Sequence, residues 1–115
     1  MYITRPGSDV PDEYAKFSGI WQDGKWDGIL CHLLAVESVS YGGHVRFVYS
    51  WGVASRWRIS EPGYVRRSGQ IEDGKLKATL GNGAKVTYWL EDATTLKGTY
   101  KRRDKSYITL KKAAE

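Results

Sequence analysis

The sequence has few of the residues from which redox and metal sites are usually built. It holds one cysteine, Cys31, and only two histidines in 115 residues. A single cysteine cannot form a disulfide within the chain, which does not fit a disulfide-stabilised secreted scaffold. Two histidines and one cysteine also supply too few ligands for a transition-metal site unless carboxylates dominate. We therefore expect no metal site and no cofactor.

Long apolar runs and familiar catalytic motifs are missing as well. No stretch approaches the roughly 18 consecutive apolar residues of a membrane-spanning helix. The start of the chain, residues 1–7, lacks the apolar segment of a signal peptide. The chain contains no P-loop, no G-x-G-x-x-G, no H-E-x-x-H and no C-x-x-C. We expect a cytoplasmic protein without a membrane partner.

What the chain does have is glycine and large aromatic residues. It contains 13 glycines, five tryptophans and eight tyrosines. Aromatic side chains suit half-buried strands, and glycines mark the turns between them, so the composition predicts β structure. The length suits one domain. We expect an irregular lead-in over residues 1–16, one domain over 17–111 and a short tail over 112–115.

Turn signals recur at short spacing after the lead-in, and apolar residues alternate with polar ones between them. Leu76, Ala78 and Leu80 share one face of such a segment, while Lys75 and Lys77 share the other. This pattern predicts an all-β, antiparallel up-and-down β-barrel of about eight strands with at most one short helix. That helix is expected within residues 8–17, as a plug for one barrel end, or within 52–63. The expected strands are 17–22, 29–37, 44–51, 64–72, 75–80, 84–90, 95–101 and 105–111.

Two motifs in this meander resemble those of the calycins, the group that includes the lipocalins. Gly19-Ile20-Trp21 matches the Gly-x-Trp of the first lipocalin strand, and Leu96-Lys97-Gly98-Thr99-Tyr100 is similar to later strands of these barrels. The resemblance implies a barrel that binds a small hydrophobic molecule. It also implies that Trp21 is structural and lies under a basic residue from the last strands, here Lys101, Arg102 or Arg103. Trp26 is expected in an exposed first loop.

The segment 29–37 is apolar on both of its faces. Cys31 and His32 are neighbours and point to opposite faces, so they cannot form a nucleophile pair. An apolar outer face suggests a cover, either the N-terminal segment or a second subunit, and hence a possible homodimer or partner domain. His32 faces the other way, among Leu30 and Leu34. It is either a ligand anchor or general base in a cavity, or a hydrogen-bonded histidine of the core.

Aromatic residues supply the candidate binding site. Phe47, Tyr49 and Trp51 share one strand face, and the long connection 52–63 follows. Long connections on a rigid scaffold often carry function. We place a ligand site at this barrel end, with Arg58 available to a ligand carboxylate. The same residues would equally fill a small barrel. The candidate ligand-binding residues are His32, Phe47, Tyr49, Trp51, Arg58, Tyr64 and Tyr88.

Charge bears on the choice of partner. The net charge is +5, and residues 61–115 carry twelve Lys and Arg against seven Asp and Glu. The basic residues mostly oppose apolar faces and do not interleave with aromatics, so a nucleic-acid partner is disfavoured. The main hypothesis is a non-catalytic lipocalin-like barrel that binds a small hydrophobic or aromatic ligand at one end. The alternatives are an accessory domain with a packed core and a cofactor-free isomerase or cyclase.

Overall fold

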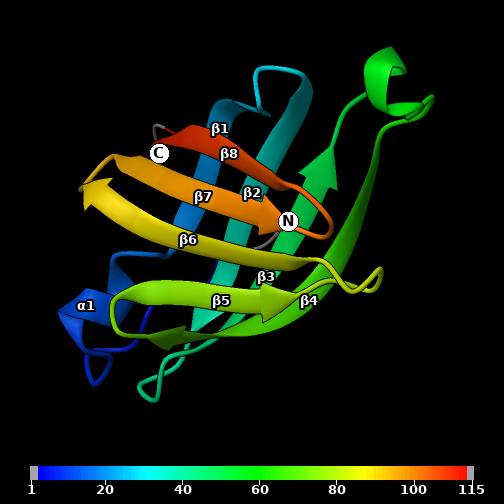
Figure 1. Ribbon diagram of the computed structural model, residues 1–115. Coiled ribbons are helices and arrows are strands. Elements are labelled where there is room, and N and C mark those ends of the chain that lie inside the picture. The colour runs from blue at the N-terminus through cyan, green and yellow to red at the C-terminus, as the bar shows by residue number, and fades with distance from the viewer. Residues whose placement is uncertain (1–2, 114–115) are drawn as a thin grey trace.

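The computed structural model describes residues 3–113 and forms a closed antiparallel barrel of eight strands in up-and-down order (Figure 1). This confirms the fold class expected from the sequence. Residues 1 and 2 of the expected lead-in and residues 114 and 115 of the expected tail lie outside the described part. The strands are β1 Gly19–Trp26, β2 Leu30–Val39, β3 His44–Trp51, β4 Gly63–Glu72, β5 Lys75–Thr79, β6 Lys85–Asp92, β7 Thr95–Lys101 and β8 Lys105–Lys112.

One helical turn and one 3-10 turn accompany the barrel, in the two places where the sequence allows a short helix. The helix α1, Asp12–Ala15, lies at one barrel end, and the 3-10 turn η1, Ser55–Trp57, lies in the β3–β4 connection. Phe17, just after α1, is 1% exposed and packs into the core. The segment around α1 therefore closes its end of the barrel, which we call the closed end (Figure 1).

The barrel closes where β1 pairs with β8, and this pairing corrects the expected end of the first strand. Asp23-Gly24 was expected to be the turn after that strand, but it is a bulge inside β1. Asp23 takes a left-handed φ of 64°, and a Cβ on Gly24 would collide with the Thr109 carbonyl of β8. The glycine lets β8 cross close to β1, which bends at the bulge as bulged strands do. The hairpin turn comes later, at Asp27-Gly28.

Inward-facing residues alternate along each strand as expected and fill the half of the barrel next to α1. The sequence predicts Leu76, Val86 and Leu96 on inner faces, and each is at most 1% exposed. Side chains from all eight strands join this core, because each strand presents every second residue to it. The largest fully buried core residues include Trp21, Phe17, Phe47, Leu34, Ile71, Leu76, Leu96 and Leu110.

Trp21 is buried as expected, but a different basic residue covers it. Its indole N–H donates to the Phe17 carbonyl over 3.0 Å, and the ring is fully buried. The Lys112 ammonium lies 5.7 Å from the ring centre. The expectation of Lys101, Arg102 or Arg103 in this place is therefore wrong. Those residues lie at the β7–β8 turn, at the other end of the barrel. Lys112, by contrast, is the last residue of β8 and pairs with Trp21 of β1.

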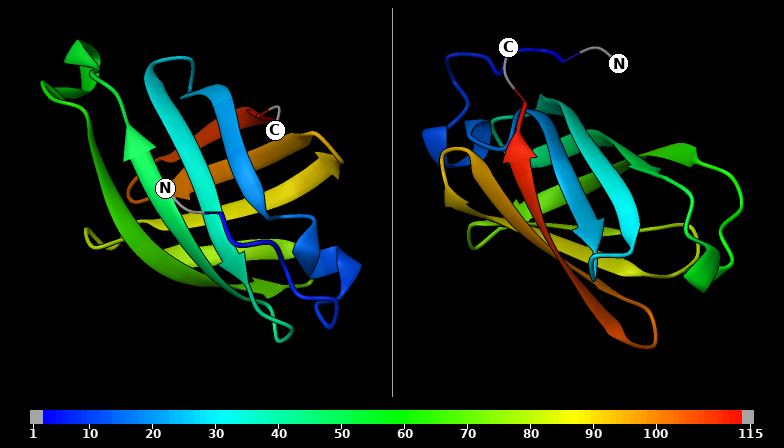
Figure 2. Two further views of the ribbon diagram at one scale, coloured as in Figure 1. Left: turned by 180° about the vertical axis from the view of Figure 1, so that it is seen from behind. Right: turned by 90° about the horizontal axis from the view of Figure 1, so that it is seen from above.

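The N-terminal segment lies across the outer face of β2 (Figure 2). The Thr4 N–H donates to the Glu37 carbonyl over 2.7 Å. The outward-facing neighbours Ala35 and Val48 are at most 3% exposed. Of the two covers expected for this face, the structure has the N-terminal segment over this part of β2. Cys31, nearer the other end of the strand, is exposed.

The strands β4 and β5 stay together only near the closed end. They pair through Gln70–Lys77, Ile71–Leu76 and Glu72–Lys75, whereas β4 pairs with β3 from Gly63 to Gln70. The N-terminal part of β4, from Gly63 to Gly69, curves away from β5 toward η1 (Figure 1). The barrel is therefore wider at the end formed by the turns 27–29, 52–62, 81–83 and 102–104, which we call the open end.

The described residues include no helix that is long and apolar enough to cross a membrane.

Candidate functional site

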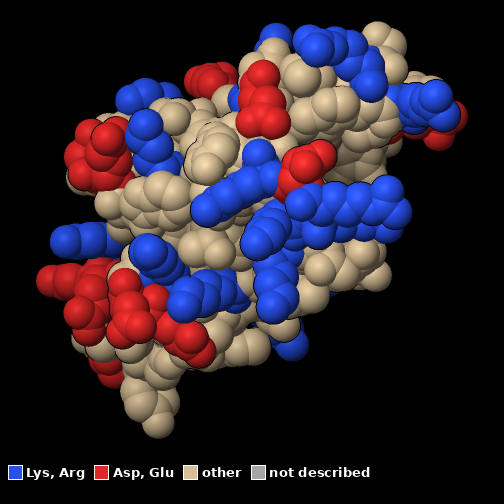
Figure 3. Space-filling view, in the orientation of Figure 1, with Lys and Arg blue, Asp and Glu red and all other residues tan. Residues whose placement is uncertain are grey.

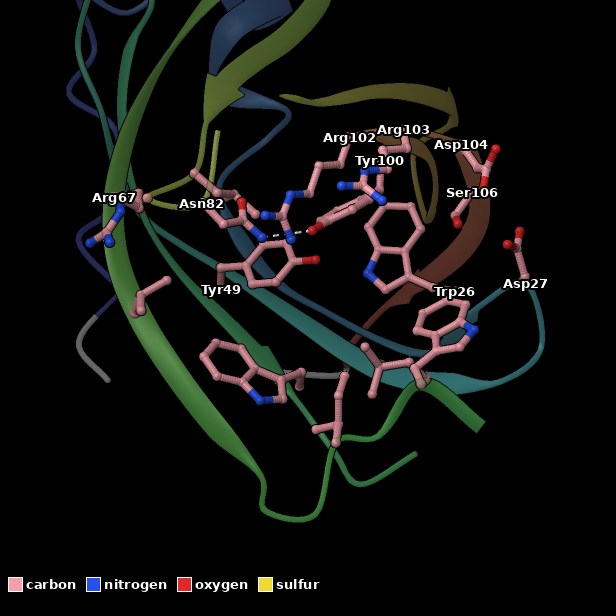
Figure 4. A pocket seen from close by; sticks show the side chains of 17 residues that line it. Trp26, Asp27, Tyr49, Arg67, Asn82, Tyr100, Arg102, Arg103, Asp104 and Ser106 are labelled. Atoms are coloured by element: carbon pink, nitrogen blue, oxygen red, sulfur yellow. Dashed lines mark hydrogen bonds between the residues drawn. The ribbon is translucent and has the colours of Figure 1, made fainter. Parts of the chain in front are cut away.

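A cavity of about 880 Å³ occupies the open end (Figure 4). The interior is thus neither wholly filled nor wholly hollow: side chains fill the closed end, and the open end contains the cavity. Ligand pockets commonly measure about 300–1,000 Å³, so this cavity has room for a small organic molecule. It is lined by Trp26, Asp27, Leu30, Tyr49, Trp51, Trp57, Ile59, Val65, Arg67, Leu80, Gly81, Asn82, Tyr100, Arg102, Arg103, Asp104 and Ser106.

A layer of stacked rings separates the cavity from the packed core. His32 lies at its centre, with ring centroids 5.3 Å from Trp26, 4.1 Å from Tyr49 and 6.0 Å from Tyr88. Trp26 and Tyr49 face the cavity, while His32 and Tyr88 are not among its lining residues. The floor of the cavity is therefore aromatic and is backed by a second row of rings.

The hydrogen bonds of His32 fix its tautomer. Its Nδ1 lies 2.7 Å from the Ser50 carbonyl, which can only accept, so Nδ1 carries the proton. Its Nε2 lies 2.8 Å from the Tyr88 hydroxyl and accepts the phenolic proton. Burial lowers the pKa of His32 to about 4, against a smaller opposite effect of the Ser50 hydrogen bond. His32 is thus neutral at pH 7 and fully hydrogen-bonded.

The two tyrosines of this layer keep their protons. Burial raises the pKa of Tyr88 well above its ordinary value, and nearby Tyr49 raises it further. Burial also raises the pKa of Tyr49, and the Trp26 N–H opposes that rise in part. Both hydroxyls are therefore neutral hydrogen-bonding groups at physiological pH.

Trp26 carries an unusual polar atom. Its indole Nε1 is buried and, among the described residues, has no hydrogen-bond partner of full geometry. The N–H lies close enough to the Tyr49 hydroxyl to affect its pKa, but the two do not form a well-aligned bond. An unpaired N–H in a buried position costs free energy unless a partner arrives. Figure 4 shows this nitrogen directed into the cavity beside the Tyr49 hydroxyl.

Tyr100 adds a second hydroxyl to the cavity wall. Its ring centroid lies 5.7 Å from that of Trp26, and its oxygen accepts a hydrogen bond from Asn82 Nδ2 over 2.9 Å. Because that bond uses the oxygen as an acceptor, the Tyr100 O–H proton is still available. Asn82 belongs to the β5–β6 turn, so the bond joins that turn to β7.

A glycine explains how the ring layer fits inside the barrel. Gly98 pairs with Tyr88 across β6 and β7, and a Cβ on Gly98 would lie 2.8 Å from the tyrosine ring. With no side chain opposite it, Tyr88 has room to reach His32. The Leu96-Lys97-Gly98-Thr99-Tyr100 motif therefore supplies three features of this end: a core leucine, space for Tyr88 and the Tyr100 wall.

Arginines surround the entrance of the cavity. Arg102 and Arg103 extend from the β7–β8 turn, and the Arg67 guanidinium lies against Gly81 across the gap between β4 and the β5–β6 turn. Figure 3 shows Lys and Arg side chains gathered on the face formed by β5, β6, β7 and their turns. The carboxylate of Asp27 accepts from the Tyr107 N–H over 2.9 Å, which ties the β1–β2 turn to β8. The entrance is thus richer in positive than in negative groups.

The structure brings some of the predicted site residues to this cavity and places others elsewhere. Tyr49 and Trp51 line it, and their rings lie 6.3 Å apart. His32 and Tyr88 lie behind the floor, and Phe47 is fully buried in the core. Arg58 follows η1 in a left-handed conformation and is not among the lining residues. Tyr64 is 64% exposed and faces outward from β4.

Sequence reasoning missed several residues of the cavity. Trp26 was expected in an exposed loop, which is wrong: it ends β1 and is 1% exposed. Arg67 and Tyr100 were not among the candidates, although strand alternation places each on an inner face, with Ile71 and Leu96 respectively. Arg102 and Arg103 were assigned to Trp21, but in an up-and-down barrel the β7–β8 turn lies at the same end as the β1–β2 turn, opposite Trp21 near the start of β1.

Comparison with protein-family models, with curated proteins and with solved structures finds no match for this chain. Among residues 3–113, no three His, Cys, Asp or Glu side chains gather closely enough to hold a metal ion.

Proposed function

We propose that this protein is a non-catalytic binding module that holds a small hydrophobic or aromatic molecule in the open-end cavity. One observation carries the proposal: the barrel is densely packed at one end and has a solvent-accessible cavity of about 880 Å³ at the other. Leaving aromatic surface such as Trp51 and Trp57 beside solvent has a free-energy cost that an apolar ligand would relieve.

A calycin-like architecture supports the same proposal. The chain has a closed up-and-down barrel, a buried Gly-x-Trp tryptophan and a lysine over its ring. Calycins bind small molecules at the open end of such barrels, and the cavity here lies at the corresponding place. We therefore propose the calycin relationship together with the function.

The alternative hypotheses receive less support from the geometry. An isomerase or cyclase would use His32 or a tyrosine as its acid or base. His32 lies behind the cavity floor with both nitrogens bonded, and burial raises the pKa of Tyr49, which makes its hydroxyl a poor base at neutral pH. An accessory domain with a packed core needs no cavity.

The experiment that tests the proposal is a screen of small aromatic and aliphatic compounds by thermal shift and tryptophan fluorescence. A binder present at about 100 times its Kd should stabilise the fold by about 2.7 kcal/mol and quench tryptophan emission. Trp51→Ala should weaken binding by more than its effect on folding explains. As a matched control, Trp89→Ala removes a tryptophan that is not among the cavity-lining residues and should leave the affinity unchanged. The absence of saturable binding across the screen would contradict the proposal.

A further inference from the structure

Several polar groups on the cavity wall have a hydrogen-bond donor to spare. The Trp26 indole N–H can only donate, and it has no well-formed partner among the described residues. The Tyr100 oxygen already accepts from Asn82, which leaves its O–H to donate. The hydroxyl of Tyr49 lies beside that of Tyr100, close enough for the two to interact electrostatically. A ligand that satisfies this wall must bring acceptors.

The charged groups at the entrance are also mainly hydrogen-bond donors without partners. In the part of the chain that the structure describes, the guanidinium groups of Arg102 and Arg103 have no ion pair and no hydrogen bond. Arg67 donates one N–H to the Arg66 carbonyl and keeps the rest of its guanidinium free. Of the two acidic residues in the lining, Asp27 is bonded to the Tyr107 N–H, and Asp104 is exposed at the rim. The entrance therefore offers unpaired positive charge next to an apolar cavity.

We propose that the ligand of this cavity is an organic carboxylate with a flat apolar body, its acid group held by Arg102 and Arg103 and its body against Trp26, Tyr49 and Trp51. This inference rests on the proposed binding function and narrows it to one class of ligand. The planar guanidinium matches a carboxylate with two parallel N–H···O bonds, which adds specificity to the charge attraction.

The position of the arginines also determines the orientation of the ligand. Arg102 and Arg103 belong to the β7–β8 turn, whereas Trp26 and Tyr49 form the floor (Figure 4). A carboxylate at the turn stays partly hydrated, which avoids the cost of burying an ion deep in the barrel. The apolar body then enters first. A second acceptor on the body, such as a ring oxygen, would meet the Trp26 N–H and the Tyr100 O–H.

The test uses two probes of nearly equal size, 2-naphthoate and 2-naphthamide, which differ in charge at neutral pH. Isothermal titration calorimetry should find that wild-type protein binds the acid about tenfold or more tightly than the amide. Arg102→Met and Arg103→Met keep an apolar side chain but remove the charge. Each substitution should lower the affinity for 2-naphthoate by about tenfold and change the affinity for 2-naphthamide by less than about twofold. Raising the NaCl concentration from about 50 to about 500 mM should weaken the binding of 2-naphthoate but not that of 2-naphthamide.

A matched control separates the local effect from net charge. Arg46→Met removes one positive charge from an exposed position on β3 that is not in the cavity lining, and it should leave both affinities unchanged. Equal binding of acid and amide by wild type would overturn the carboxylate inference while leaving the binding function intact. Failure of both probes, together with an empty ligand screen, would overturn the binding function itself. An oligodeoxythymidine that displaces 2-naphthoate and binds more tightly would overturn the inference in favour of nucleic acid.

Discussion

His32 shows how a single buried residue can connect stability to pH. Its ring is 3% exposed, and its two hydrogen bonds fit only the neutral form, in which Nδ1 donates and Nε2 accepts. Protonation would place a hydrogen on Nε2, so the Tyr88 O–H could no longer donate to it. The network therefore opposes the charged form in addition to the cost of desolvation.

We predict that this histidine makes the fold less stable in mild acid. Its pKa is about 4 in the fold and 6.5 in the unfolded chain, so between these values the unfolded state binds a proton that the native state does not. Stability from this group is complete above about pH 6.5 and falls as the pH drops to about 4, by about 3 kcal/mol in total. Denaturant unfolding at several pH values measures this slope. In His32→Gln the slope over that window should be shallower, and an unchanged slope would contradict the assignment.

Two tryptophans near the ends of β1 should matter for stability, although only one was expected to. Trp21 and Trp26 are both at most 1% exposed. Replacing either with alanine should cost about 3–5 kcal/mol, as large-to-small changes in cores do. Trp57, on η1, is 36% exposed, and Trp57→Ala should cost under about 1 kcal/mol. Chemical denaturation of the three variants checks the order. A loss of unfolding free energy under about 1 kcal/mol for Trp26→Ala would contradict a structural role for Trp26 in the ring layer.

At the scale of the element, β1 shows why strand boundaries are hard to read from sequence. The chain has two nearby Asp-Gly pairs, at 23–24 and 27–28, and each is a good hairpin signal. The structure uses the second as the turn because Asp27 bonds to Tyr107 through both its backbone N–H and its carboxylate. That contact spans 80 positions of the chain. Local sequence carries no information about it, so the bulge at the first pair could not be foreseen.

Strands β6 and β7 provide an element-scale prediction. Gly98→Ala should destabilise the protein by about 1–3 kcal/mol, because the new methyl group would lie 2.8 Å from the Tyr88 ring in a packed site. Gly42→Ala is the matched control, since nothing lies within 4 Å of a Cβ built there and its φ is not in the left-handed region. Thermal unfolding compares the two. If Gly98→Ala is as stable as Gly42→Ala, the ring layer has more freedom than the geometry indicates.

At the scale of the molecule, the sequence predicted the barrel well and its cavity only in part. Alternation in β5, β6, β7 and β8 identified the inner faces, because a closed meander buries every second residue of each strand. It did not predict where the interior stops being filled. That boundary depends on rings from four different strands, Trp26, His32, Tyr49 and Tyr88, meeting in one layer. Contacts between distant strands of this kind leave no periodic signal.

The parting of β4 from β5 also has a consequence for how copies of the protein behave toward one another. Closed barrels have no free strand edges, but here residues 63–69 of β4 pair only with β3. This half-strand therefore has no strand partner along one side, and such an edge is the template on which edge-to-edge aggregation starts. Arg66 and Arg67 lie in the middle of it, and both are exposed; Arg66 is ion-paired with Glu37 over 3.3 Å, whereas no ion pair of Arg67 is found in the described part of the chain. Two copies of the Arg67 charge would come close together if two such edges met, so this arginine opposes edge-to-edge pairing at the open seam.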